Sequence, residues 1–167
     1  MKRTKILYVI PAKTATGPHI AVLNMALGVS KNPAMKIHIL SSDRFKTNYR
    51  THYEKLKRVA VFHQVPAEIP KIFYWISLLI CAFKLVLKEH IDIVHTASVR
   101  AVIMFAPICK LTSAKLVLSL EGDPLYEMFE FSFIRRAIIL LNWTVGMRLV
   151  DLVLPCSKWL KDEASKH

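Results

Sequence analysis

The pattern of apolar and polar positions divides the chain into two kinds of segment, which alternate along the sequence. Short apolar runs rich in strand-forming residues stand at 4–10, 35–41, 59–65, 91–97, 114–120 and 151–157. Longer segments with apolar residues at helical spacing separate them, at 19–32, 71–89, 98–112 and 125–149. The polar residues 46–58 predict a helix or an irregular segment, and a last helix is expected from residue 158. Pro107 predicts a kink or an early end of its helix.

Strands separated by helices predict right-handed crossovers and a parallel sheet covered on both faces. The runs ILYVI, LVLSL and DLVLP are nearly all apolar, as in strands buried on both sides. The expected fold class is therefore α/β, a Rossmann-like three-layer sandwich with a mostly parallel sheet of about six strands. Ligands of such sheets bind beyond the carboxyl ends of the strands. That rule selects the loops 11–18, 41–47, 63–70, 95–98, 121–125 and 155–157.

Composition agrees with one globular domain over residues 1–167. Apolar residues make up 53% of the 167 positions, enough for a substantial core. The scattered cysteines Cys81, Cys109 and Cys156 form no C-x-x-C pair, which favours reduced thiols in the cytosol. The dispersed histidines have no metal-ligand spacing, so no metal and no cofactor is expected. The apolar run after the basic start ends at Pro11, too short for a secretory signal.

The charge is unevenly distributed. The chain has 24 basic and 12 acidic residues, a net charge of +12. Residues 1–60 hold twelve Lys or Arg and two acids, which accounts for +10. Such a field attracts lipid headgroups, nucleic acid or phosphorylated ligands, although an ordinary solvated basic surface is the alternative. No nucleic-acid-binding motif accompanies the charge, so nucleic acid is not an expected partner.

The first loop lacks the glycines of a dinucleotide fingerprint, which argues against a nicotinamide dehydrogenase. Gly17 can still let a ligand approach the backbone, and Pro18 suits the first turn of a helix. The free N–H groups of that turn can bind an anion. An ordinary strand-to-helix turn is the alternative.

Four segments in order carry a family resemblance. The glycine-containing first loop is followed by DIVHTAS at 92–98, LVLSLEGDP at 116–124 and VDLVLPCSKWLKDE at 150–163. Together they resemble the N-terminal, acceptor-side domain of a family 4 glycosyltransferase with the GT-B fold, over nearly the whole chain. The resemblance implies that a nucleotide-sugar donor, bound mainly by a second domain, gives its hexosyl group to a sugar or lipid-linked acceptor. Such reactions serve cell-surface polysaccharide biosynthesis.

The resemblance also implies roles for individual residues. Gly17 lies near the donor diphosphate and the acceptor, and Ser157 faces the interdomain cleft. Glu121 stands where the family usually has a histidine, and its carboxylate could bind sugar hydroxyls or act as a catalytic base. The neighbouring substrate-binding candidates are His95, Gly122 and Asp123. For His95 an interior structural role is the alternative, and for Asp123 a turn or helix cap before Pro124.

The GT-B fold needs a second, donor-binding domain, and no such domain and no paired-glutamate motif follow within this sequence. We therefore expect a truncated chain or one with a C-terminal partner chain, inactive in isolation. A non-catalytic Rossmann-like binding or scaffolding subunit is the alternative function.

The segment 71–89 bears on membranes. Apolar residues surround it apart from a narrow stripe of Ser77, Cys81, Lys84 and Lys88. Its longest uncharged run is shorter than the roughly 20 residues that span a bilayer, so a crossover helix packed on the sheet is expected. The alternative is a helix that dips into an anionic membrane surface. The expected location is cytoplasmic, including peripheral attachment to the inner face of the membrane.

Overall fold

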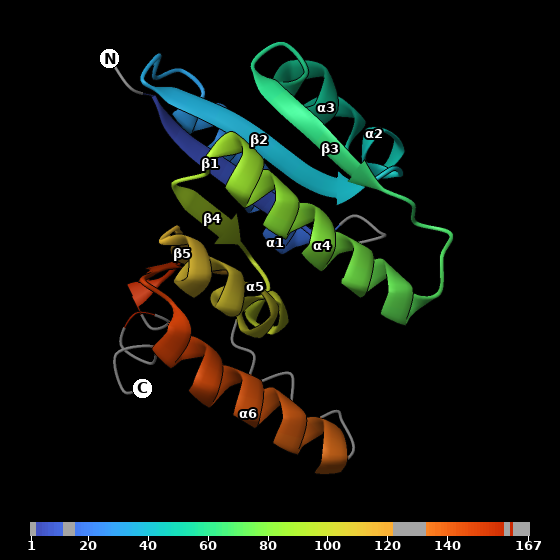
Figure 1. The fold of residues 1–167 in the computed structure, drawn as a ribbon, viewed down its shortest axis with the longest axis vertical. Helices are drawn as coiled ribbons and strands as arrows, with labels where there is room; N and C mark the ends of the chain where they lie inside the picture. Colours follow the sequence, from blue (N-terminus) through green and yellow to red (C-terminus); the bar gives the residue numbers. More distant parts are fainter. Residues whose placement is uncertain (1–2, 12–15, 122–132, 159–160, 162–167) are drawn as a thin grey trace.

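The computed structural model describes residues 3–11, 16–121, 133–158 and 161 (Figure 1). Six strands form one sheet in the order β3-β2-β1-β4-β5-β6, and every neighbouring pair is parallel. This confirms the predicted α/β class. The strands are β1 (Thr4–Ile10), β2 (Met35–Ser42), β3 (Ala60–Val65), β4 (Ile93–Thr96), β5 (Lys115–Leu120) and β6 (Leu152–Pro155). The helices are α1 (Gly17–Val29), α2 (Phe45–Asn48), α3 (Arg50–Leu56), α4 (Lys71–Glu89), α5 (Val99–Thr112) and α6 (Phe133–Leu149).

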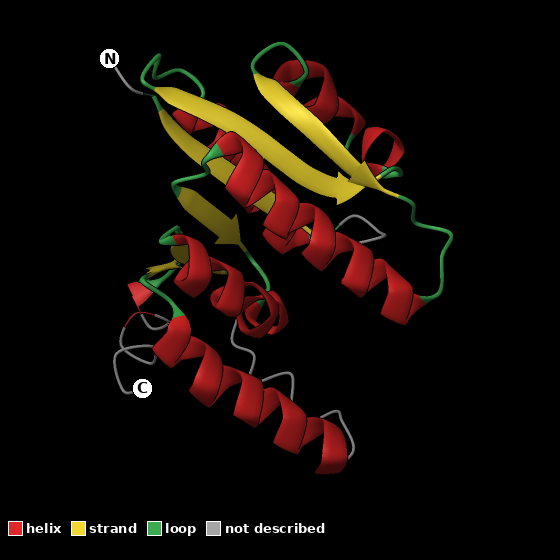
Figure 2. Ribbon diagram, in the orientation of Figure 1, coloured by secondary structure: helices red, strands yellow, loops and turns green. Residues whose placement is uncertain are grey.

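Two helical layers enclose the sheet, as Figure 2 shows. Side chains alternate along each strand, so Tyr8 of β1 faces one layer and Leu7 faces the other. Tyr8 belongs to a core with α1, α2 and α3, whereas Leu7 belongs to a larger core with α4, α5 and α6. Both side chains are almost completely buried, because a central parallel strand is covered on both faces.

The helix predictions hold with two changes. The polar residues 46–58 contain two short helices, α2 and α3. Pro107 lies inside α5, which continues to Thr112, so the alternative of an early end is wrong. Phe105 and Ile108 on either side of the proline are buried, and this packing outweighs the lost backbone hydrogen bond. Residues 122–132, which include the start of the predicted segment 125–149, lie outside the described part, as do residues 159–160 and 162–167 of the helix expected from residue 158, so that helix stays a prediction.

Two aspartates form hydrogen bonds between neighbouring strands at the amino end of the sheet. The Lys5 N–H donates to Asp92 Oδ2 at 2.8 Å, and the Leu116 N–H donates to Asp151 Oδ2 at 2.8 Å. Each carboxylate precedes one strand and binds the first residues of its neighbour. The hydrogen bond from Leu116 is the main reason that the pKa of Asp151 is lowered. The aspartate that opens the DLVLP motif therefore has a structural role in this fold.

Helix α4 is the crossover between β3 and β4, as predicted. It begins after Pro70 and ends at His90, whose left-handed backbone (φ 52°) lets the Ile91 N–H donate to the Val86 carbonyl at 3.1 Å. Its inner side packs into the core through Tyr74 and Leu78. None of the helices that the structure describes is both long and apolar enough to cross a bilayer.

Candidate functional site at the carboxyl ends of the strands

The strand order places a switch point between β1 and β4. The chain leaves β1 toward β2 on one side and leaves β4 toward β5 on the other. The loops after these two strands therefore diverge, and in open α/β sheets ligands bind in the crevice that this leaves. The described residues at this crevice are Pro11, Thr16 and Gly17 after β1, and Ala97 and Ser98 after β4.

Gly17 is exposed and begins α1 at the crevice. A Cβ added at Gly17 would meet none of the described residues within 4 Å, and its φ is not positive. Neither those residues nor the backbone conformation therefore demand glycine there. Pro18 occupies the first turn of α1, as predicted, and that turn has no acid and no side-chain cap. Its open N–H groups suit a negatively charged ligand group.

A buried histidine lies directly behind this turn. His19 Nδ1 is 2.5 Å from Thr16 Oγ1 and 3.3 Å from the Tyr49 hydroxyl. The Thr16 N–H donates to the same tyrosine hydroxyl at 3.2 Å. Burial lowers the pKa of His19 to about 4, so the ring is neutral at pH 7. Each hydroxyl can donate to a bare Nδ1 or accept from an Nδ1–H, so both neutral tautomers of the ring are compatible with these contacts.

The reasoning from sequence missed this cluster. The hydrophobic pattern places His19 in a helix and Tyr49 in a segment that is helical or irregular, and it gives neither residue a role in a site. The signal available was a histidine two residues after the candidate glycine, at the start of a helix beside a sheet end. The partner Tyr49 lies 30 residues away and becomes a neighbour only through the fold of α2 and α3.

His95 lies just inside the sheet. It is next to last in β4 and 5% exposed, on the face that α1 covers. His95 Nε2 is 2.7 Å from Ser119 Oγ, whose hydroxyl also contacts Met25 of α1. The ring packs against Tyr8, with centroids 5.0 Å apart. Burial lowers the pKa of His95 to about 4. These surroundings match the structural alternative, with the ring directly beneath the carboxyl ends.

Glu121 and Ser157 lie at the ends of two adjacent strands. Leu120 pairs with Pro155, so Glu121 directly after β5 neighbours the end of β6. Burial raises the pKa of Glu121, although the side chain keeps part of its exposure. Ser157 is exposed, and its carbonyl accepts the Lys161 N–H at 3.1 Å. Gly122 and Asp123 lie outside the described residues. The fold thus brings Gly17, Glu121 and Ser157 to one edge, with His95 just below it.

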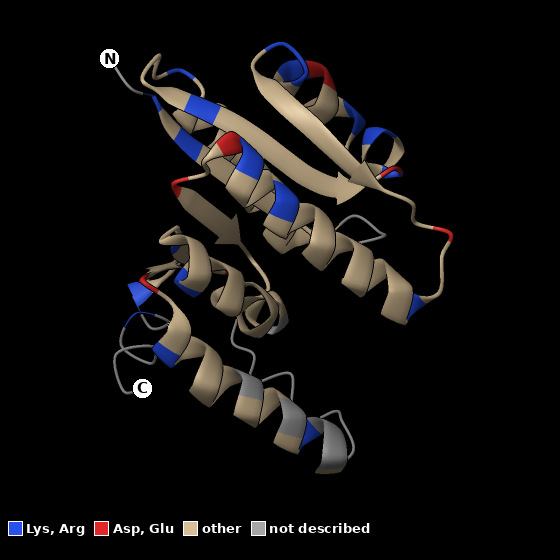
Figure 3. Cartoon of the chain, viewed as in Figure 1, with Lys and Arg blue, Asp and Glu red and all other residues tan. Residues whose placement is uncertain are grey.

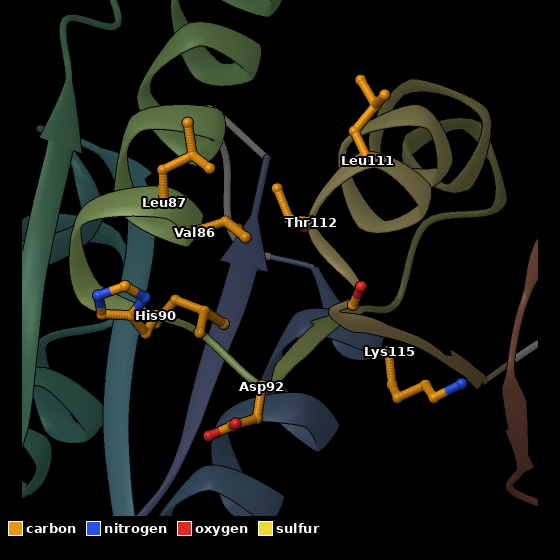
Figure 4. Close-up of a pocket in the computed structure, with 9 residues that line it drawn as sticks. Val86, Leu87, His90, Asp92, Leu111, Thr112 and Lys115 are labelled. Carbon is orange, nitrogen blue, oxygen red and sulfur yellow. The ribbon is translucent and has the colours of Figure 1, made fainter.

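A hollow of about 640 Å³ lies at the opposite, amino end of the sheet (Figure 4). It is formed by the ends of α4 and α5 and includes Asp92, His90 and Lys115. The Asp92 carboxylate accepts the Lys5 N–H, and Lys115 Nζ is paired with Asp151 at 3.0 Å. Asp92 and Lys115 in this hollow therefore stabilise the sheet through these contacts. Within the described residues, no group of three or more His, Cys, Asp or Glu could hold a metal ion.

Among known proteins, only solved structures match this chain, and they match it in fold. No protein-family model and no curated protein matches the chain. Anabaena HepE, solved with UDP and glucose, has a TM-score of 0.65 and 15% sequence identity over 98% of this chain and 41% of HepE. A UDP-N-acetylglucosamine 2-epimerase has a TM-score of 0.68 and 15% identity, over 99% of this chain and 45% of the epimerase. MurG from Acinetobacter baumannii has a TM-score of 0.59 and 10% identity, over 92% of this chain and 41% of MurG.

These proteins are GT-B fold glycosyltransferases and epimerases. The chain spans less than half the length of each of them and has the architecture of one Rossmann-like GT-B domain. At such low identity the likeness establishes the fold alone. Membership of glycosyltransferase family 4 stays a prediction.

Proposed function

We propose that this chain is the acceptor-side domain of a family 4 type GT-B glycosyltransferase. Its partner lobe would bind a nucleotide sugar, and the hexosyl group would pass to a lipid-linked or glycan acceptor at the inner face of the membrane. One observation carries the proposal. In a GT-B type sheet, the β1–β4 switch point has an open helix turn at Gly17, and Glu121 and Ser157 follow neighbouring strands at the same edge.

In this proposal Glu121 is the catalytic residue. Burial raises its pKa, which makes the carboxylate a better proton acceptor than an exposed glutamate near neutral pH. It would accept the proton of the acceptor hydroxyl as that oxygen bonds to the anomeric carbon of the sugar, while the bond from this carbon to the phosphate oxygen breaks and the nucleoside diphosphate leaves with the electron pair. Ionised, it cannot donate a hydrogen bond as the histidine usual at this position can.

The other residues would bind and orient the substrates. Gly17 would let a diphosphate approach the first turn of α1, where backbone N–H groups offer hydrogen bonds. Neutral His19 would hold this turn through Thr16 and Tyr49. Ser157 and the loop with Gly122 and Asp123 would contribute polar contacts to the cleft, and His95 would support the sheet beneath them through Ser119.

The test is sugar transfer by the enzyme assembled with a donor-binding lobe, over a panel of nucleotide sugars. Glu121→Gln keeps the side-chain size and removes the base, so we expect turnover to fall by about 100-fold or more. Glu54→Gln is the matched control, because the Glu54 side chain is 49% exposed on α3, outside the loops at the carboxyl ends of the strands, and should leave turnover unchanged.

We expect no transfer by the 167-residue chain alone. Transfer by that chain would overturn the need for a second lobe, and full turnover by Glu121→Gln would remove the assigned base. If no nucleotide sugar is used by the assembled protein, the non-catalytic binding subunit becomes the better account.

A further inference from the structure

The outer side of α4 exposes an unusual amount of apolar surface. Six large apolar side chains there are between 38% and 66% exposed. We call this set the α4 stripe: Ile72, Phe73, Ile76, Ile80, Phe83 and Leu87. Contiguous exposed apolar surface of this kind marks an interaction site more often than isolated apolar residues do.

Helix geometry makes the stripe continuous. At 3.6 residues per turn its six positions fall within about 100° of arc and extend over roughly 22 Å. The buried positions of α4, such as Leu78 and Leu85, point to the opposite side and pack into the core. The helix therefore has two apolar sides, of which the sheet uses one.

Positive charge flanks the stripe (Figure 3). Lys84 and Lys88 lie beside it on α4, while the helix has no charged residue between Lys71 and Lys84. The sequences of α4, α5 and α6 contain a single acid, Glu89, which is ion-paired with Lys36 at 3.7 Å. Further exposed basic residues on these helices are Lys110, Arg136 and Arg148. A partner for this layer must be apolar and negatively charged.

The apolar surface continues from α4 to α5. Leu87 at the end of the stripe lines the hollow at the amino end of the sheet, and Leu111 lines the same hollow from α5 (Figure 4). Leu111 is 78% exposed, among the most exposed large apolar residues of the described chain. Lys110 is next to it in the sequence, so this end of the surface also combines apolar and basic groups.

We propose that the α4 stripe, extended by Leu111, docks on the surface of an anionic lipid bilayer. The apolar side chains would enter the acyl boundary while Lys84, Lys88 and Lys110 meet the headgroups. A second copy of the chain fits poorly, because a two-fold symmetric contact through this layer would bring the basic residues of one copy close to the same basic residues of the other. The stripe also faces away from the sheet, whereas the proposed glycosyl-transfer cleft lies at the carboxyl ends of the strands.

This surface differs from the basic first third of the chain. The lysines and arginines of α2 and α3 belong to the layer on the other face of the sheet. The charges that accompany the stripe come instead from α4, α5 and α6. The inference names the surface that the membrane location in the proposed function would use, and it rests on the proposed function to that extent. The two tests are separate, since vesicle binding is measured without any substrate and glycosyl transfer without vesicles.

The experiment is flotation of the purified chain with phosphatidylcholine vesicles that contain about 30% phosphatidylglycerol or none. We expect binding to the anionic vesicles and a loss of roughly tenfold in affinity for Ile80→Glu. Val59→Glu is the matched control, because both side chains are 49% exposed and both changes add one negative charge. It should bind within about twofold of the unmodified chain.

A second pair of variants tests the charges without touching apolar surface. Lys88→Glu should weaken binding to anionic vesicles, whereas Lys55→Glu on α3 should weaken it much less. Circular dichroism establishes that each variant is folded. No binding to anionic vesicles, or equal binding by folded Ile80→Glu, would overturn the proposal. So would a dimer of the unmodified chain that Ile80→Glu dissociates, since the stripe would then be a protein interface.

Discussion

The two aspartates at the amino end of the sheet and Glu121 at its carboxyl end are held in opposite ways. At the amino end, Asp92 and Asp151 each accept a backbone N–H from the neighbouring strand, and the pKa of Asp151 is lowered. At the carboxyl end, burial raises the pKa of Glu121. A carboxylate bound by fixed donors is held in its charged form, whereas one that burial pushes toward the neutral form can exchange protons. The difference separates two acids that support the fold from the acid that we propose as the catalytic base.

Acid should destabilise the folded chain through three buried histidines, of which His38 lies inside β2 and is 1% exposed, and this is the largest effect expected. Burial lowers the pKa of His19, His38 and His95 to about 4 each. In the unfolded chain they take up protons near pH 6.5, while in the folded chain they stay neutral. The unfolded state therefore binds more protons between about pH 6.5 and 4, and stability falls as pH falls through that window. We expect a loss on the order of several kcal/mol, measured by urea unfolding at stepped pH.

His95→Gln sharpens this experiment. It removes one of the buried titrating groups, so its free energy of unfolding should depend less steeply on pH than that of the unmodified chain. The Asp151 hydrogen bond should persist through the window, because the pKa of that carboxyl is lowered. A free energy of unfolding that stays constant from pH 7 to 5 would contradict the assignment of neutral buried histidines.

Much of the fold can be predicted because it follows local patterns. Each strand run and each amphipathic helix has its own signal, and the strand at 4–10 and the helix at 71–89 match β1 and α4 in their bounds. The alternation of the two kinds of element then favours the parallel sheet. The helix through Pro107 was harder to predict, because buried neighbours outweigh the local preference.

The site was predictable only as a set of loops. The sheet rule placed Gly17 and Glu121 at one edge, because it depends on topology alone. The environment of His19 depends on Tyr49, a long-range contact that no local pattern indicates. The position of His95 beneath Ser119 likewise needed the register of β4 against β5. The α4 stripe was visible as an apolar helix, but which side stays exposed is a property of the packed structure.

The amino-end carboxylates provide the next test of the comparison. Asp92→Ala leaves the Lys5 N–H without its partner, so we expect a loss of about 1–3 kcal/mol in the free energy of unfolding. Asp92→Asn keeps an acceptor oxygen and should lose less. Glu121→Ala at the other end should change stability by less than about 0.5 kcal/mol. Urea unfolding at pH 7 measures all three, and equal losses for Asp92→Ala and Glu121→Ala would erase the distinction between the two ends.

The last test concerns Gly17, where only a small effect on stability is expected and the effect on function should be clear. A Cβ at Gly17 or at Gly28 would have no neighbour within 4 Å among the residues that the structure describes, and both glycines lie in α1, one at its start and one in its last turn. Both alanine variants should fold, with stability changes of about 1 kcal/mol or less. A diphosphate approaching the first turn would meet the new methyl group at residue 17 and not at residue 28. In the assembled enzyme, Gly17→Ala should therefore raise the KM for the nucleotide sugar while Gly28→Ala leaves it unchanged, and an equal KM in both would mean that no ligand approaches the open start of α1.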